Sequence, residues 1–162
     1  MTSIYNFKVE GIRGEEIDFA EFKGKIIMVV NVASECGFTP QYAQLQDLYN
    51  EFNNELVIIG FPSNDFGGQE PGTNNEIHTF CSRNFGVSFP LASKITILGE
   101  DKHPIYQWLT QKSLNGHSDS EVQWNFQKYL LDETGQLCAV FPSSVDPCSE
   151  EILNFFSGPT AS

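Results

Sequence analysis

The sequence is poor in cysteine and has no closely spaced cysteine pair. Its 162 residues include four cysteines, Cys36, Cys81, Cys138 and Cys148, and none of them belongs to a CxxC motif. This spacing excludes a disulfide scaffold and a structural zinc site. We therefore expect no metal ion and no cofactor, and each thiol has to be considered by itself.

Basic residues are also scarce. Nine lysines and arginines face 21 aspartates and glutamates, which leaves a net charge of −12. Such a surface repels phosphate groups and anionic lipid headgroups. Nucleic acid is therefore excluded as a partner, and no stable membrane association is expected.

Long apolar runs are absent as well. No stretch approaches the roughly 18 apolar residues of a membrane span, and residues 1–10 contain no basic region followed by an apolar segment. We expect a cytoplasmic protein whose thiols are kept reduced. With 40% hydrophobic residues, the chain suits a single domain over residues 1–162 with one core.

The first half of the sequence predicts a hairpin followed by a strand–helix–strand unit. Turn-forming residues at 11–14 separate two short apolar segments, as in a β-hairpin. Two longer runs rich in Ile and Val indicate parallel strands buried on both faces, and the residues between them have helical periodicity. Thr39 is the expected N-cap of that helix and Pro40 its first residue. The expected strands are 5–9, 17–19, 25–32 and 56–61, and the helix ends near residue 52.

The second half predicts further helices and an antiparallel hairpin. Thr73 and Glu76 have the spacing of a capping box, which predicts a helix over residues 74–84. Pro104 is expected to open another helix. The remaining predicted elements are an extended piece within 89–97, a loop over 112–121, strands over 124–131 and 136–141, and a helix over 149–156.

This order of elements predicts an α/β protein with a thioredoxin-like fold. We expect a central mixed sheet flanked by helices and preceded by an N-terminal β-hairpin. Dithiol proteins of this fold carry C-x-x-C at the start of the first major helix, whereas this chain has Cys36-Gly37-Phe38-Thr39. A local dithiol is therefore not available, and Cys36 has to act as a single thiol.

Cys36 lies where a predicted strand turns into a predicted helix. Unpaired backbone N–H groups and the positive end of the helix dipole would stabilise its thiolate, which is the nucleophilic form. A buried structural thiol at a strand end is the alternative interpretation of this position.

Three segments resemble the signatures of the glutathione peroxidase family. They are Asn31-Val-Ala-Ser-Glu-Cys-Gly-Phe-Thr-Pro-Gln-Tyr42, Gly60-Phe-Pro-Ser-Asn-Asp-Phe-Gly-Gly-Gln-Glu-Pro-Gly72 and Trp124-Asn-Phe126. The resemblance covers the chain from about residue 5 to residue 141 and implies the cysteine-type branch. It matches the family's catalytic tetrad to Cys36, Gln69, Trp124 and Asn125. The last three are neutral hydrogen-bond donors, which can stabilise a thiolate and a leaving oxygen without offering a competing nucleophile.

By this resemblance the protein is a thiol peroxidase that reduces hydrogen peroxide and organic hydroperoxides, lipid hydroperoxides included. Cys36 would be oxidised to a sulfenic acid, and Cys81, in the matching helix, would resolve it as a Cys36–Cys81 disulfide. Cys148 is the rival resolving thiol, and Cys138 is expected in the core. Because a disulfide needs Cα atoms within about 7 Å, we expect the helix around Cys81 to unwind.

The resemblance also bears on partners. Cysteine-type relatives with a resolving thiol mostly use thioredoxin, so thioredoxin is expected as the reductant rather than glutathione. The alternative is a peroxide sensor that passes oxidation to a partner protein.

The chain departs from the family pattern at Glu35, where lysine is common, at Asp65, where glutamine is usual, and at Ser63, which is often cysteine. No long loop for tetramer contacts is evident in residues 112–121, so we expect a monomer or a weak homodimer.

Overall fold

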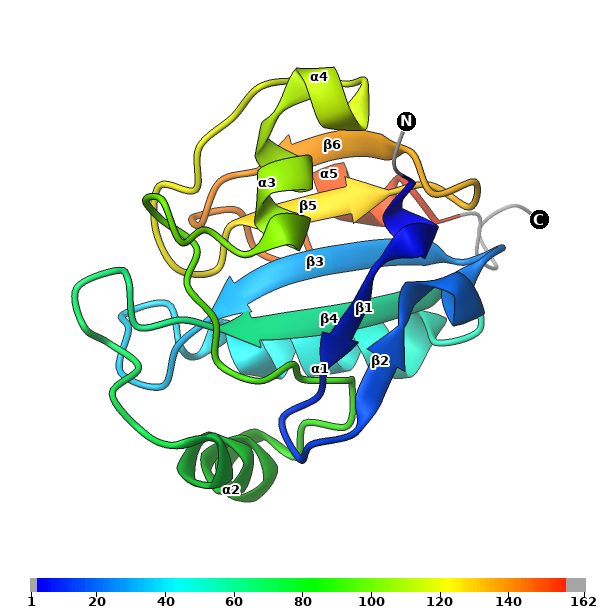
Figure 1. Cartoon of the computed structure of the whole chain (residues 1–162). Coiled ribbons are helices and arrows are strands. Elements are labelled where there is room, and N and C mark those ends of the chain that lie inside the picture. The colour runs from blue at the N-terminus through cyan, green and yellow to red at the C-terminus, as the bar shows by residue number, and fades with distance from the viewer. Residues whose placement is uncertain (1–2, 157–162) are drawn as a thin grey trace.

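In a computed structural model, which describes residues 3–156, two parallel strands form the centre of the molecule (Figure 1). β3 (Ile26–Val32) pairs in parallel with β4 (Leu56–Pro62), and its other edge pairs antiparallel with β5 (Lys128–Leu131). β6 (Leu137–Phe141) completes the sheet, whose strand order is β4-β3-β5-β6. The predicted mixed sheet is confirmed.

Alternate residues of β3 enter opposite halves of the core. Met28 and Val30 pack in one apolar cluster, and Ile27 and Val29 pack in the other. Every residue of β3 and β4 is buried. This burial on both faces explains why the two strands are nearly continuous apolar runs in the sequence.

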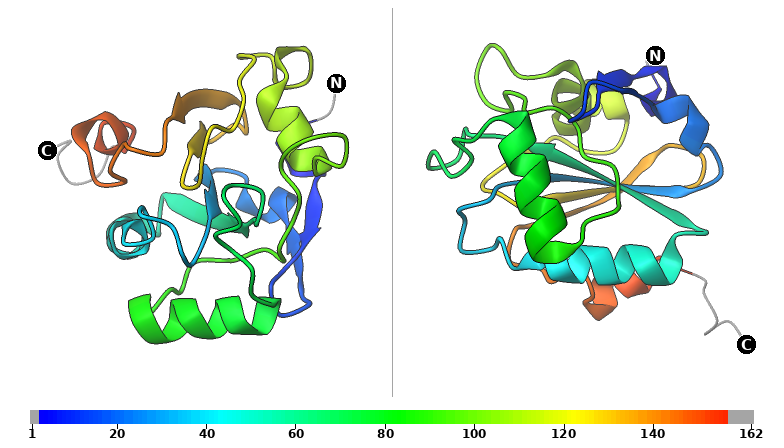
Figure 2. Two further views of the ribbon diagram at one scale, coloured as in Figure 1. Left: turned by 90° about the vertical axis from the view of Figure 1, so that its left-hand side faces the viewer. Right: turned by 90° about the horizontal axis from the view of Figure 1, so that it is seen from below.

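Helices and a hairpin cover the two faces of the sheet (Figure 2). One face packs against α1 (Gln41–Phe52) and the short α5 (Glu150–Leu153). The other face packs against α3 (Pro104–Thr110) and the antiparallel hairpin of β1 (Lys8–Glu10) and β2 (Glu16–Asp18). The thioredoxin-like arrangement and the N-terminal hairpin are thus as predicted.

Helix α2 (Asn74–Phe85) lies outside these layers, beyond β4 and beside the start of α1 (Figures 1 and 2). It begins at the predicted capping box, in which Thr73 Oγ1 accepts the Glu76 N–H and the Glu76 carboxylate accepts the Thr73 N–H. Ile77 and Cys81 are its buried residues. Phe80 and Phe85 are partly buried and pack against the Tyr42 ring of α1, so the helix is held to the rest of the protein along one face.

The boundaries of several elements differ from the predictions. β1 is shorter than predicted and β2 is shifted by one residue, because side-chain caps open the 3₁₀ turns η1 (Ile4–Asn6) and η2 (Phe19–Phe22) at their outer ends. The predicted loop over 112–121 begins with a short helix, α4 (Lys112–Asn115), which ends at Gly116 with φ of +77°. Helix α5 ends at residue 153 rather than 156.

Within residues 3–156, no helix combines the length and the apolar character that crossing a membrane requires.

Candidate active site

The Cys36 thiol lies in the turn between β3 and α1. It is 7% exposed, and its Sγ accepts a hydrogen bond from the Phe38 N–H, with 3.3 Å between nitrogen and sulfur. An ionised sulfur accepts such a bond more strongly than a neutral one. The predicted backbone donor is therefore present, but it belongs to the turn that precedes the helix and not to the helix itself.

Thr39 shapes this turn and does not cap the helix. Its hydroxyl donates to the Ala33 carbonyl at 2.8 Å and accepts the Cys36 N–H at 2.9 Å. Helix α1 begins at Gln41, with Pro40 as N-cap and no side-chain cap bond. The prediction of Thr39 as N-cap and Pro40 as first helical residue was wrong, because the threonine hydroxyl is used inside the turn.

The loop after β4 lies against the Cys36 turn. The Glu35 N–H donates to the Gln69 carbonyl at 3.0 Å. Both loops leave the same end of the sheet, where the carboxyl ends of parallel β3 and β4 meet (Figure 1). Gly67 and Gly68 have φ of +69° and +63°, a conformation that glycine adopts without steric cost. The loop therefore brings Gln69 beside the residue that precedes Cys36.

Trp124 and Asn125 lie in a turn and not in the strand predicted over 124–131. β5 begins only at Lys128. Phe126 has φ of +69°, which is left-handed and incompatible with a strand. The prediction was wrong for the first four residues of that segment, and right for 128–131.

The Trp124 indole packs against the Gln69 loop. Its ring meets the Phe66 ring edge to face, with 6.0 Å between the ring centroids. A Cβ atom at Gly67 would come within 2.9 Å of the indole, so this close approach requires glycine. Trp124 also packs against the apolar cluster that contains Cys36.

Asn125 is completely buried and joins its turn to the Gln69 loop. Its Nδ2 donates to Gln69 Oε1 at 3.1 Å. Its Oδ1 is buried and accepts no hydrogen bond from the part of the chain that the structure describes. Because a buried acceptor without a donor is costly, this oxygen is available to a proton-bearing ligand.

Cys81 faces the protein interior from α2 and is 1% exposed. All four cysteines are free thiols. Burial raises the pKa of Cys81 to about 11; the Glu70 carboxylate adds to the rise, and the Tyr42 hydroxyl opposes it. In this packed position Cys81 is a thiol at neutral pH and a poor nucleophile.

A hollow of about 320 Å³ separates the Cys36 turn from α2. Ser34 and Glu35 line one side of it and Ile77 lines the other, with the buried Glu70 at its edge. Burial raises the pKa of the Glu70 carboxyl. The sequence analysis did not single out Glu70, although its position directly after Gln69 is a signal that could have found it.

The other two thiols are half-buried and form hydrogen bonds to backbone carbonyls. Cys138 Sγ donates to the Leu130 carbonyl at 3.3 Å, and Cys148 Sγ donates to the Gln44 carbonyl at 3.4 Å. Burial raises the pKa of each thiol to about 11. Neither thiol is activated in this conformation.

No group of three or more His, Cys, Asp or Glu side chains within residues 3–156 is arranged to hold a metal ion.

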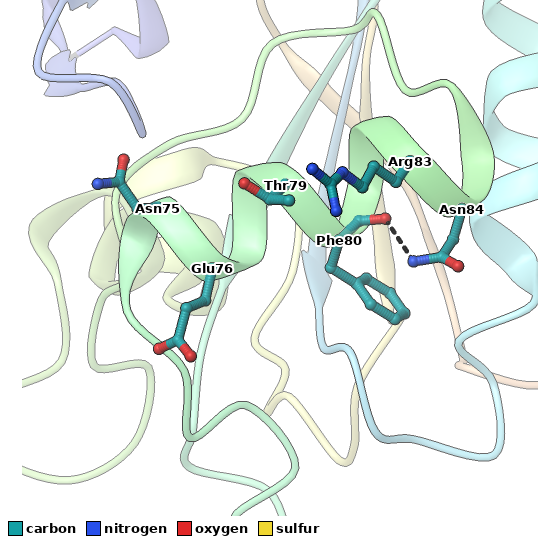
Figure 3. A pocket seen from close by; sticks show the side chains of 6 residues that line it. All are labelled: Asn75, Glu76, Thr79, Phe80, Arg83 and Asn84. Atoms are coloured by element: carbon teal, nitrogen blue, oxygen red, sulfur yellow. Dashed lines mark hydrogen bonds between the residues drawn. The ribbon is translucent and has the colours of Figure 1, made fainter.

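A second hollow, of about 410 Å³, lies over the outer face of α2 (Figure 3). In it, Asn84 Nδ2 donates to the Phe80 carbonyl at 2.9 Å. No cysteine lines it, whereas Cys81 lies on the buried face of the helix. The lining residues are Asn75, Glu76, Thr79, Phe80, Arg83 and Asn84.

Comparisons with known proteins identify the family of the chain. The family model of glutathione peroxidase matches residues 4–110. The chain is 42% identical over 156 residues to a glutathione peroxidase-like peroxiredoxin of Chlamydomonas reinhardtii, covering 93% of this chain and 96% of the relative. It is 40% identical over 153 residues to a hydroperoxy fatty acid reductase of Synechocystis, covering 90% and 89%. The crystal structure of Trgpx in apo form has a TM-score of 0.72 at 34% identity and covers 95% of each chain. The chain therefore belongs to the glutathione peroxidase family, and it is a thiol peroxidase that reduces hydroperoxides.

Proposed function

We propose that Cys36 is the peroxidatic residue and that Gln69, Trp124 and Asn125 complete its catalytic tetrad. The observation that carries this proposal is that three distant segments meet at the end of the sheet where Cys36 lies. Asn125 is bonded to Gln69, and the Gln69 backbone is bonded to the residue before Cys36. Trp124 packs on the same apolar cluster as the thiol.

In the first step the Cys36 thiolate attacks one oxygen of the hydroperoxide. An S–O bond forms as the O–O bond breaks, the sulfur loses two electrons, and the alkoxide or hydroxide that leaves takes up a proton. The products are Cys36 sulfenic acid and an alcohol or water. Charge develops on the leaving oxygen during this step, so nearby N–H donors lower its barrier.

The neutral donors suit an uncharged substrate. Amide and indole N–H groups stabilise the negative charge that develops during the reaction. Because these groups are neutral, they do not require a charged group on the substrate for binding. Hydrogen peroxide and organic hydroperoxides are such substrates. The Synechocystis relative, named a hydroperoxy fatty acid reductase, supports the inclusion of lipid hydroperoxides.

Cys81 is the proposed resolving residue. Its thiolate attacks the Cys36 sulfur, the S–O bond breaks, hydroxide leaves as water after protonation, and a Cys36–Cys81 disulfide forms. The pKa of about 11 for the buried Cys81 thiol means that this step needs α2 to open. Opening has to expose Ile77 and Cys81, the two buried residues of the helix. It also has to separate Phe80 and Phe85 from the Tyr42 ring, which is a small set of contacts for a helix of 12 residues.

Thioredoxin is the proposed reductant. Its dithiol supplies two electrons and two protons by exchange with the Cys36–Cys81 disulfide. The peroxiredoxin name of the Chlamydomonas relative supports a protein dithiol over glutathione. We further propose that the enzyme works in the cytoplasm as a monomer or weak homodimer.

The first test follows NADPH oxidation with thioredoxin and thioredoxin reductase, and in parallel with glutathione and glutathione reductase. We expect sustained hydroperoxide consumption with the thioredoxin system and little with glutathione. A single stoichiometric burst with both systems would instead indicate a redox relay. Cys36→Ser should abolish consumption in either system.

The second test maps disulfides by mass spectrometry after one equivalent of hydrogen peroxide. We expect a Cys36–Cys81 bond in the wild type, and sustained turnover in Cys148→Ser but not in Cys81→Ser. The two variants are matched, because each removes one thiol whose pKa is raised by burial to about 11. A Cys36–Cys148 bond in the wild type would overturn the assignment of Cys81.

A further inference from the structure

One buried side chain, outside the proposed tetrad, holds the turn that carries Trp124 and Asn125. Asn31 lies near the carboxyl end of β3 and is 0% exposed. Its Nδ2 donates to the Trp124 carbonyl at 3.1 Å, and its Oδ1 accepts the Gln127 N–H at 3.0 Å. Its own backbone carbonyl accepts the Phe126 N–H at 2.6 Å. Asn31 thus binds the backbone on both sides of Asn125.

The turn needs such support because it contains an unfavourable backbone conformation. Phe126 has φ of +69°, which costs a non-glycine residue about 1–2 kcal/mol. Its ring is completely buried and meets the Tyr42 ring edge to face, with 5.3 Å between the centroids. Contacts from β3 and α1 therefore impose a conformation that residues 124–127 would not adopt by themselves.

This turn determines where the Asn125 side chain points. Asn125 Nδ2 reaches Gln69 Oε1, and the residues on either side of Asn125 are bound by Asn31. Asn31 lies in β3, and Cys36 lies in the turn that directly follows this strand. A single rigid element, β3, thus places both the thiol and the segment that carries two of its proposed donors.

We propose that Asn31 is a positioning residue for peroxide reduction, acting through Trp124 and Asn125 on the reaction at Cys36. This inference rests on the proposed function of these three residues. Asparagine suits the task because its amide donates one hydrogen bond and accepts another from adjacent atoms. Aspartate has the same shape, but when ionised it presents an oxygen to the Trp124 carbonyl and repels it.

The test compares Asn31→Ala and Asn31→Asp with Asn115→Ala. Asn115, on α4, is a matched control: it is 9% exposed, its Nδ2 donates to the Trp108 carbonyl at 2.9 Å, and its Oδ1 accepts the His117 N–H at 2.7 Å. Both alanine variants should lose stability, because each leaves buried backbone groups unpaired. Urea unfolding measures that loss.

The decisive readout is the second-order rate of Cys36 oxidation by hydrogen peroxide, measured on the folded fraction of each protein by stopped-flow fluorescence. We expect Asn31→Ala to lower this rate about tenfold or more, since small misplacements of reacting groups have large kinetic effects. Asn115→Ala should stay within about twofold of wild type. Equal rates for the two alanine variants would overturn the proposal.

Asn31→Asp keeps the proposal testable if the alanine variant fails to fold. A protonated aspartic acid can donate to the Trp124 carbonyl as asparagine does, whereas the ionised form cannot. The ratio of its oxidation rate to that of wild type should therefore rise as the pH falls from 7 to 5. A ratio that does not change with pH would count against positioning. A wild-type protein that does not react with hydrogen peroxide would refute the proposed function itself, which is a separate outcome.

Discussion

Asn125 Nδ2 donates to Gln69 Oε1 at 3.1 Å, although 56 residues separate the two side chains in sequence. This bond occupies the carbonyl oxygen of the Gln69 amide. The amide nitrogen of Gln69 therefore keeps its N–H groups for another acceptor. Within the proposed tetrad, Asn125 thus orients Gln69 as a donor.

Gln69→Glu tests this orientation. The carboxylate can still accept from Asn125, but it has no N–H to offer and adds a negative charge. We expect the rate of Cys36 oxidation by hydrogen peroxide to fall about 100-fold, as expected for the loss of one donor to a developing charge. Stopped-flow fluorescence measures this rate. Gln136→Glu, an exposed change of the same kind, is the control, and a Gln69→Glu rate similar to that of this control would contradict the assignment.

The elements that could be predicted from the sequence are those fixed by local chemistry. The strands β3 and β4 were predicted because both of their faces are buried and their residues are apolar throughout. Helix α2 was predicted because Thr73 and Glu76 form a capping box within one turn. In both cases the residues that decide the structure lie within the element itself.

The turn at 124–127 could not be predicted for the opposite reason. Its residues suit a strand, but their backbone groups bond to Asn31, far away in sequence. The site residues divide in the same way, into those indicated by local sequence and those that depend on distant contacts. Cys36 was indicated by its own strand–turn segment. Gln69, Trp124 and Asn125 came from resemblance alone, because their meeting depends on how separate loops pack at one end of the sheet.

Glu35→Lys should speed the oxidation of Cys36. Glu35 is exposed and directly precedes the thiol, and a cation at this position favours the thiolate over the thiol. Because solvent and salt screen an exposed charge, we expect about a two- to fivefold increase in rate at low ionic strength, which shrinks as salt is added. Glu10→Lys makes the same change of charge on β1. Equal increases in the rate for the two substitutions would mean that the net charge of the protein causes the effect, and not the proximity of the charge to Cys36.

Thr73→Ala should speed disulfide formation if α2 has to open. Removing a helix N-cap costs about 1 kcal/mol, which raises the population of the opened helix about fivefold. The rate at which the Cys36 sulfenic acid becomes a disulfide, followed by quenched-flow mass spectrometry, should rise by up to that factor. Asp18→Ala is the control, since Asp18 caps η2 by accepting the Ala20 N–H at 3.0 Å. An unchanged or slower rate in Thr73→Ala would contradict unwinding.

Lys128 links three parts of the fold from a completely buried position on β5. When protonated, its Nζ donates to Gln41 Oε1 at 2.6 Å, to the Ser143 carbonyl at 3.0 Å and to the Val145 carbonyl at 2.6 Å. The first residue of α1 and the segment before α5 are thereby held against the sheet. A buried amine in such a position makes stability depend on pH.

Burial lowers the pKa of Lys128 to about 7, and the Asp146 carboxylate opposes this shift. In the unfolded chain the pKa returns to about 10.4, so between these values the unfolded state binds about one proton more than the folded state. Stability from this group therefore rises with pH, by up to about 1.4 kcal/mol per pH unit.

Lys128→Met tests this dependence, because methionine is of similar size and does not titrate. Urea unfolding from pH 7 to pH 10 should show the wild type gaining stability relative to Lys128→Met. Buried thiols and tyrosines act in the opposite direction near pH 10, but they are common to both proteins and cancel in the difference. A constant difference between the two proteins would mean that Lys128 keeps its charge inside the fold.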